Sequence, residues 1–292
     1  NKIILLLCTL LGIFLVVFFF YLHLETQREE LIIQNKMRDL QISFDKILKL
    51  KVTPLEKHVY FEYTLWDEMV NFVSTGDNKW AVSQLEPALS TYDIKAAWIY
   101  DTTFRLIYSI NSLNDSKLKE LPLPKKIMPK LFSNGYFCHF FINSPSGIME
   151  ILGSAIHPTS DSDRKTAIRG FYFICHIWDK AFFDEISNLT DCTIILPKSN
   201  GAMKSEPFTK SPGIGVIEFV KELNGWDGKP VTQITVHSET PAIKMFHQFS
   251  VRGMWLYIAF SLGLIFFLSY YLMHWISHPL GIISKSLDTN NT

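Results

Sequence analysis

Two uninterrupted apolar runs, residues 3–22 and 254–273, bracket a middle segment in which polar and apolar residues alternate. Each run has twenty residues and no charged side chain. As a helix, each would extend about 30 Å, the thickness of a bilayer's hydrocarbon core, and a helix satisfies its own backbone hydrogen bonds in lipid. The pattern predicts two transmembrane helices, with both ends of the chain on one side and residues 25–253 on the other.

The first run has a second interpretation, a cleaved signal peptide. Its apolar stretch is longer than the ~7–15 residues usual in such peptides, and the exit sequence from Tyr21 to Glu25 contains no small-x-small cleavage site. A retained anchor is therefore favoured. The few flanking charges slightly favour an orientation with both ends inside, and the two-pass layout supports that orientation more strongly.

Beyond the first run, apolar residues recur at spacings of four and three, the pattern of a coiled-coil seam. The seam consists of Ile33, Met37, Leu40, Phe44 and Ile47. It predicts a helix over 25–50 that packs either on the domain's own core or on a second copy of the chain. The second copy is favoured, because a helix leaving the membrane has little else beside it at first.

The middle segment then changes from helical to strand periodicity. Pro54 predicts a kink or restart, followed by an aromatic-rich helix over 55–73 and a shorter one over 80–89. Asp179 is a good N-cap for a helix over 180–188, and a helix from Thr240 leads into the second apolar run. Strands are predicted at 96–100, 104–108, 136–142, 148–157, 169–178, 193–196, 216–223 and 231–237, with a helical piece at 126–132.

These elements predict an α+β fold, in which a long N-terminal helix packs on an antiparallel sheet of roughly five or six strands. The layout suits a PAS-like or Cache-like sensory module over 51–239, flanked by the two transmembrane helices. The chain has 28 basic and 28 acidic residues, so its zero net charge gives no indication of a nucleic-acid partner. Aromatic residues make up 14% of it, which is enough for a packed core.

Four segments of the middle region resemble one family, the fourth type of CHASE extracellular sensory domain. The first is Tyr63 to Val73, with its Trp66-Asp67 pair. The others are Trp98 to Asp101, then Gly170 to Phe173 with Asp179 to Phe182, and finally Asp227 to Val231. The resemblance extends over about 51–239. One departure lies in the first hairpin, where Thr102-Thr103-Phe104 occupies the turn in which the family usually has a glycine.

The residues after the second apolar run, Trp275 to Ile283, are similar to the opening of a HAMP linker, in which a proline follows the membrane helix. Pro279 suits the first turn of a new helix. Ile276, Leu280, Ile283 and Leu287 then form a second seam. Residues 274–292 are therefore expected to begin a parallel two-chain coil. Families with this sensory domain usually continue into a histidine kinase, diguanylate cyclase or phosphodiesterase.

Catalytic and metal-binding signatures are missing from the sequence. The nine histidines form no His-x-His or His-Glu-x-x-His unit, and no Cys-x-x-Cys, Walker or G-x-S-x-G motif occurs. No enzyme activity, metal or cofactor is expected of this segment. Cys138-His139 and Cys175-His176 both lie in predicted strands, where neighbouring strands would allow a soft-metal site or a disulfide. Strand parity argues against this, because adjacent residues point to opposite faces, and free thiols are favoured.

The Trp66-Asp67 pair is the main candidate for ligand recognition, and it has two interpretations. In the favoured, structural one Trp66 anchors the core and Asp67 bonds a nearby loop. In the functional one Asp67 offers a carboxylate to a cation, an amine or a hydroxylated ligand, in a pocket between helix and sheet. The proposed walls are Tyr63, Trp66, Trp98 and Tyr100, with Tyr136 and Tyr172 as further contacts.

Together these patterns predict the sensory and membrane portion of a homodimeric bacterial receptor in the inner membrane. A small-molecule or protein ligand outside would bias the paired helices, with Ile33, Met37, Leu40, Phe44, Pro279, Leu280 and Ile283 carrying the signal. The alternative is an anchored exported domain that acts as a binding scaffold without signalling output.

Overall fold

The computed structural model describes residues 2–113, 118–133, 135–145, 147–196 and 215–274. The chain divides into two compact units. The first comprises Asn1–Arg38, Lys210–Ile217 and Glu239–Thr292, and the second Asp39–Thr209 and Glu218–Ser238. The second unit holds the mixed helix and sheet structure that the sequence predicts.

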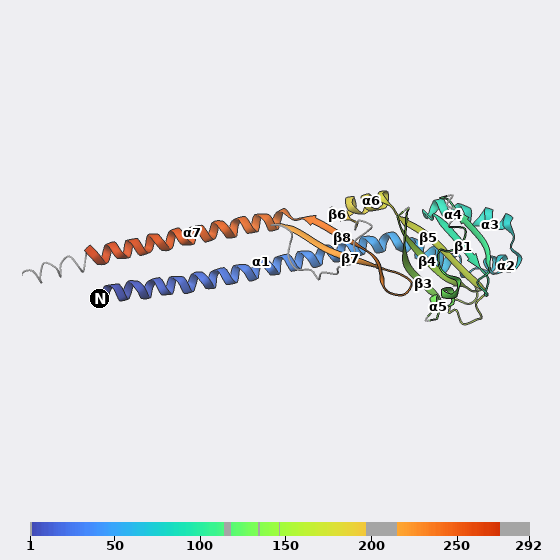
Figure 1. Cartoon of the computed structure of the whole chain (residues 1–292), viewed down its shortest axis with the longest axis horizontal. Coiled ribbons are helices and arrows are strands. Elements are labelled where there is room, and N and C mark those ends of the chain that lie inside the picture. Colours follow the sequence, from blue (N-terminus) through green and yellow to red (C-terminus); the bar gives the residue numbers. More distant parts are fainter. Residues whose placement is uncertain (1, 114–117, 134, 146, 197–214, 275–292) are drawn as a thin grey trace, which may run out of the picture. The chain divides into compact units, whose positions relative to one another are not determined.

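Two long helices contain the apolar runs, α1 (Lys2–Lys57) and α7 (Pro241–Leu272) (Figure 1). Both are long and apolar enough to cross a membrane. Thr240 is the N-cap of α7, which confirms the predicted start of this helix. Within the first unit the two helices pack on each other, because Tyr257 stacks on Phe18 with ring centroids 5.4 Å apart, and His247 Nδ1 lies 3.1 Å from Glu29.

The predicted helix over 55–73 is wrong in its middle. Helix α1 continues through Pro54, then widens into a π-helical turn, η1 (His58–Glu62), and ends. The Thr64 hydroxyl donates to the Val59 carbonyl at 2.7 Å, and Leu65 pairs with His157 as an isolated parallel bridge. These contacts draw the backbone out of the helix until α2 (Asp67–Thr75) begins. Helical periodicity alone gives no sign of such a tertiary contact.

Short helices follow α2 on the same side of the domain. Gly76 caps α2 in the left-handed conformation with φ 65°, which a residue without Cβ adopts at no steric cost. The predicted helix over 80–89 is two helices, α3 (Asn78–Gln84) and α4 (Glu86–Thr91). Asp77 accepts hydrogen bonds from the first turn of α3 and so sets its start.

In the part of the chain that the structure describes, eight strands form two sheets, where the sequence predicted a single sheet of roughly five or six strands. The larger sheet has the order β2-β1-β5-β4-β3, antiparallel throughout. The smaller has the order β6-β8-β7. The strands of the larger sheet are β1 (Ala96–Tyr100), β2 (Leu106–Asn111), β3 (Phe137–Ser144), β4 (Gly147–Ile156) and β5 (Gly170–Trp178). Those of the smaller are β6 (Thr193–Ile195), β7 (Val216–Asn224) and β8 (Pro230–Glu239).

The β1–β2 turn shows how the chain replaces the expected glycine. Phe104 takes the left-handed conformation itself, with φ 59°. Its ring stacks on Phe171 with centroids 4.4 Å apart, while Asp101 Oδ1 accepts from the backbone N–H groups of Thr103 and Arg105. Aromatic packing and an Asx turn together hold a conformation that a phenylalanine alone would avoid.

The larger sheet buries a separate core on each face. The end of α1, with α2, α3 and α4, covers one face and forms what we term the helix-side core, which includes Met69, Leu85 and Ile174. The connection between β2 and β3, with η3 (Lys125–Ile127) and α5 (Met128–Leu131), covers the other face and forms the far-side core, which includes Met128 and Phe173. A third cluster packs α1 and α6 (Lys180–Thr190) around Trp178 and strands of the smaller sheet.

Candidate functional site

The sheet separates five of the seven residues predicted to bind a ligand. Tyr63, Trp66 and Tyr172 belong to the helix-side core, whereas Trp98 and Tyr100 lie in the far-side core. Trp98 Nε1 donates to the Leu118 carbonyl, and the Tyr100 hydroxyl accepts from Leu121 N–H, so both side chains anchor the β2–β3 connection. These five aromatic residues therefore do not surround one pocket, because strand alternation places Trp98 and Tyr100 on the opposite face.

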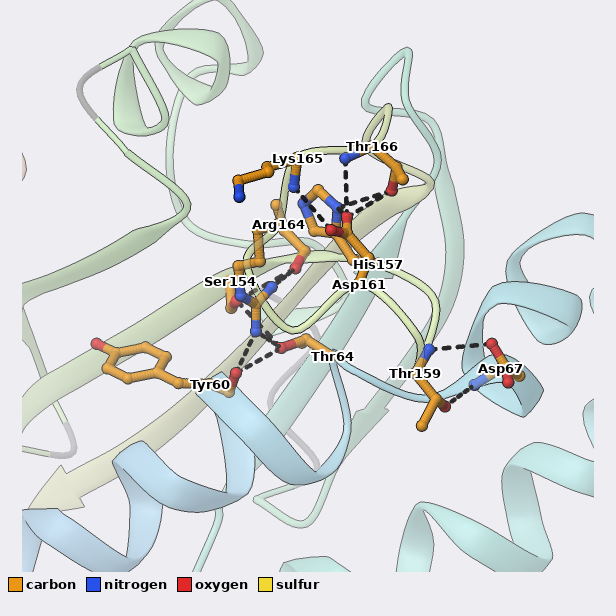
Figure 2. Close-up of polar contacts among 11 residues, drawn as sticks. Tyr60, Thr64, Asp67, Ser154, His157, Thr159, Asp161, Arg164, Lys165 and Thr166 are labelled. Carbon is orange, nitrogen blue, oxygen red and sulfur yellow. Dashed lines mark hydrogen bonds and ion pairs between the residues drawn. The ribbon is translucent and has the colours of Figure 1, made fainter.

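The remaining two predicted residues lie at the edge of the domain. Asp67 Oδ1 accepts from Thr159 N–H at 3.0 Å, and Thr159 Oγ1 accepts from Asp67 N–H at 3.1 Å (Figure 2). This is the loop contact that the structural interpretation predicts. Tyr136 is 37% exposed and places its ring edge-on against His157.

A histidine missed at the sequence level occupies the middle of the helix-side aromatic cluster. His58 is fully buried, its Nε2 lies 3.1 Å from the Tyr172 hydroxyl, and its ring centroid is 4.2 Å from that of Tyr63. The ring of Tyr92 packs at 4.5 Å. Burial disfavours the charged form and lowers the pKa of His58 to about 4. His58 is therefore neutral at physiological pH.

Hydrogen bonds from buried or partly buried side chains tie the loop after β4 to the domain. Arg164 is 3% exposed and donates to the carbonyls of Ala155 and Tyr60 and to Thr64 Oγ1 (Figure 2). Asp161 accepts from the N–H groups of Lys165 and Thr166 and lies 3.1 Å from His157 Nδ1. The Thr166 hydroxyl, which donates to Asp161 Oδ2 at 2.6 Å, lowers the pKa of Asp161 well below its usual range, and the backbone hydrogen bonds add to this shift. The loop thus braces the break between η1 and α2.

Strand order decides whether Cys138-His139 and Cys175-His176 can form a disulfide or a metal site. β4 lies between β3 and β5, so the strands that carry Cys138 and Cys175 are not neighbours, and both thiols are free. The thiols lie in the far-side core, while His139 and His176 point to the other face, as strand parity predicts. Within the described ranges no group of three or more His, Cys, Asp or Glu side chains is arranged to hold a metal ion.

The two histidines instead meet at a carboxylate in β4. Glu150 is fully buried, and its Oε1 lies 2.9 Å from His139 Nε2. Its Oε2 lies 3.2 Å from His176 Nδ1 and accepts from Trp178 Nε1 at 2.8 Å. Burial raises the pKa of Glu150, but hydrogen bonds and charges from both histidines outweigh it and lower the pKa to about 2. No sequence motif marks this site, since its members come from three strands.

His176 also lines an open cleft of about 550 Å³, which we term the α1–α6 cleft. This volume falls in the range of small-molecule sites. Its walls carry two ion pairs, Lys51 with Glu185 and Lys95 with Asp93. The remaining lining residues are Pro54, Leu55, Ser90, Thr91, Tyr92, Asp179, Ala181 and Phe182. None of the seven predicted ligand contacts, all of which lie within the described residues, lines this cleft.

The predicted signal-transmission residues differ in their surroundings. Phe44 is fully buried and packs edge-on against Phe219 at 5.5 Å, and Leu40 packs beside it. This part of the seam therefore packs on the chain's own core, the alternative to a dimer contact. Ile33 and Met37 are partly exposed. Pro279, Leu280 and Ile283, like all of residues 275–292, lie outside the described residues.

Known proteins resemble the chain in its sensory part. The model of the CHASE4 domain matches residues 55–195. The periplasmic domain of Vibrio cholerae LuxQ, as its selenomethionine crystal structure, is similar at a TM-score of 0.42 with 12% identity, covering 72% of this chain and 99% of that one. A second crystal structure of that domain has a TM-score of 0.41 and 12% sequence identity, and the match covers 71% of this chain and 100% of that one. No curated protein matches the chain. A CHASE4 domain is not itself catalytic, and residues 55–195 form such a CHASE-type extracellular sensory domain.

Proposed function

We propose that the chain is the sensory and anchoring part of a two-pass receptor of the bacterial inner membrane, with its middle region, residues 25–253, outside the cytoplasm. The observation that carries this proposal is the CHASE4 match at 55–195 between two helices long enough to cross a bilayer. Exposed apolar side chains along both helices support it, among them Val16, Phe19, Leu256, Phe260 and Phe266. Such a surface is stable in lipid and costly in water.

The sensory core, residues 51–239, is proposed to be a PAS-like or Cache-like module. The α1–α6 cleft is the proposed place where a stimulus acts, because α1 contributes Lys51, Pro54 and Leu55 to its wall. A change in the cleft would act directly on the helix that contains the first candidate span. A bias of about 1–3 kcal/mol between two states is typical of such coupling.

The receptor is further proposed to be a homodimer with a HAMP-like linker and a kinase, cyclase or phosphodiesterase output. The seam residues Ile33 and Met37, which are partly exposed, support a second copy beside α1. Phe44 does not belong to that interface, since it is buried in its own chain.

Labelling of introduced cysteines tests the topology. Ser83 is exposed in the sensory unit, and Ser286 follows the second apolar run. In a background without native cysteines, a membrane-impermeant maleimide should label Ser83→Cys in intact spheroplasts and Ser286→Cys only after lysis. Equal labelling of the two before lysis would contradict the two-pass arrangement.

A second set of cysteines tests the dimer. Met37→Cys should form an intermolecular disulfide under mild oxidation, and the exposed neighbour Gln34→Cys serves as the matched control. Failure of Met37→Cys to cross-link more than Gln34→Cys would argue for a single chain and for the scaffold interpretation.

A further inference from the structure

His176 places each of its ring nitrogens next to a carboxylate. Nδ1 lies 3.2 Å from Glu150 Oε2 in the buried site, and Nε2 lies 3.7 Å from Asp93 Oδ2 at the α1–α6 cleft. The His176 side chain is 9% exposed and that of Asp93 is 66% exposed. One imidazole therefore stands between a carboxylate inside the sheet and a carboxylate in contact with solvent.

The protonation state of this ring decides how many of the two carboxylates it can bind. A neutral imidazole has a single N–H, whereas an imidazolium has two. Ionised Glu150 can only accept, so neutral His176 must carry its proton on Nδ1. The Nε2 lone pair then faces the Asp93 carboxylate. Both groups are acceptors, so no hydrogen bond forms between them. Only the imidazolium can donate to both.

We propose that His176 is a proton-binding site of this domain, and that protonation draws Asp93 toward it and closes one wall of the α1–α6 cleft. The present distance of 3.7 Å is within reach of an ion pair but beyond a hydrogen bond, so a small shift of residues 91–95 completes the contact. The idea that this protonation is an input to the receptor rests on the proposed function. The proton-dependent contact between His176 and Asp93 does not depend on it.

Charged groups lie on several sides of His176. Lys95 pairs with the other oxygen of Asp93, and Lys51 of α1 pairs with Glu185 of α6 across the cleft. Asp179 adds a further carboxylate at the start of α6, and Glu150 lies beneath the ring. On the α6 side Phe182 presents its ring at 5.2 Å and contributes no charge. Each lysine is matched by one carboxylate. Glu150, which His139 also contacts, and Asp179 are the carboxylates that remain near the imidazole.

A proton suits this arrangement better than a metal ion. His139 contacts Oε1 of Glu150 while His176 contacts Oε2, so the two nitrogens do not converge on one point. Histidine is also the side chain whose charge most readily changes near neutral pH. The ligand proposed is therefore the proton itself.

Hydrogen–deuterium exchange of the full chain in lipid nanodiscs tests the proposal. After correction for intrinsic rates, amide exchange in residues 91–95 should slow roughly two- to fivefold from about pH 8 to about pH 5.5, as a partly exposed ion pair allows. His176→Gln and Asp93→Asn should each abolish this slowing. Asp93 has φ 53°, a conformation that asparagine also tolerates, so Asp93→Asn preserves the backbone.

His139→Gln is the matched control, because His139 contacts the same carboxylate but not Asp93. It should retain the slowing. Titration of His58, which packs on Tyr92, does not interfere, since its pKa of about 4 lies below the range used. The proposal is overturned if amide exchange in residues 91–95 of the wild type does not slow at the lower pH, or if it slows in Asp93→Asn as much as in the wild type. Asp93→Asn decides the matter even if His176→Gln fails to fold. These results are independent of membrane topology, so they separate this proposal from the proposed function.

Discussion

The hydroxyl of Tyr172 in β5 lies 3.1 Å from Nε2 of His58 in η1 and joins the sheet to the end of α1 inside the helix-side core. The imidazole of His58 is neutral, and this makes its contact with Tyr172 sensitive to acid. The folded pKa is about 4 and the ordinary value 6.5, so the unfolded chain takes up the proton first. Stability from His58 is thus fully present above about pH 6.5 and is lost as the pH falls toward 4.

Replacing His58 by phenylalanine should remove this acid dependence, which amounts to about 3 kcal/mol across the window. Unfolding midpoints of the full chain in detergent, measured from about pH 7 to about pH 4, should fall less steeply for His58→Phe than for wild type. His23→Gln, at an exposed position, serves as control and should follow wild type. Parallel curves for all three proteins would show that His58 does not control acid stability.

Glu150 should dominate at lower pH. Its pKa is lowered from 4.5 to about 2, so its stabilisation is present above about pH 4.5 and disappears as the pH falls toward 2. Glu150→Gln should therefore be less stable than wild type near neutral pH, by an amount on the order of 3 kcal/mol, and should lack the loss below pH 4.5. Chemical denaturation at several pH values measures this, with exposed Glu120→Gln as control. Equal acid sensitivity in wild type and Glu150→Gln would contradict the assignment.

Arg164 should be the most costly residue to change in the loop after β4. Replacement by methionine takes the charged donor away from the Tyr60 and Ala155 carbonyls and removes the cation from the face of Phe137, 4.8 Å away. We expect a loss of about 3 kcal/mol in the free energy of unfolding. The neighbouring Lys165→Ala, which removes an exposed side chain, should change it by less than about 0.5 kcal/mol. Similar midpoints for both variants would mean that the loop does not brace the domain.

Gly153 permits the close approach of β3, β4 and β5. A Cβ at this position would lie 2.4 Å from Phe173 Cδ1 and 2.8 Å from Cys138 Sγ. Gly153→Ala should therefore destabilise the domain by about 1–3 kcal/mol through overpacking. Gly135→Ala, where a Cβ meets no atom within 4 Å, is the matched control. Thermal unfolding of the two variants side by side distinguishes crowding from a general cost of losing glycine.

The sequence predicted individual elements better than it predicted their assembly. Strand β1, the start of α7 and the Asp179 cap of α6 lie where their patterns indicated, because each depends on residues close together in the chain. The helix break at 63–66 could not be predicted from local sequence, because its residues are held by contacts with distant parts of the chain. It depends on Thr64, Leu65 and the distant Arg164, a contact that only the folded chain brings about.

Composition and periodicity alone therefore determined the two apolar helices and the α+β class, because these depend on local spacing and on side-chain chemistry. The sensory character of the middle region was indicated by the resemblance of four of its segments to one family. Tertiary structure decided which face each aromatic residue occupies, that β4 lies between the two cysteines, and that Glu150 gathers His139 and His176. Strand order and register are set by pairing between distant segments. A one-residue change in register would reverse every side chain, so the candidate site could not be assembled before the sheet was known.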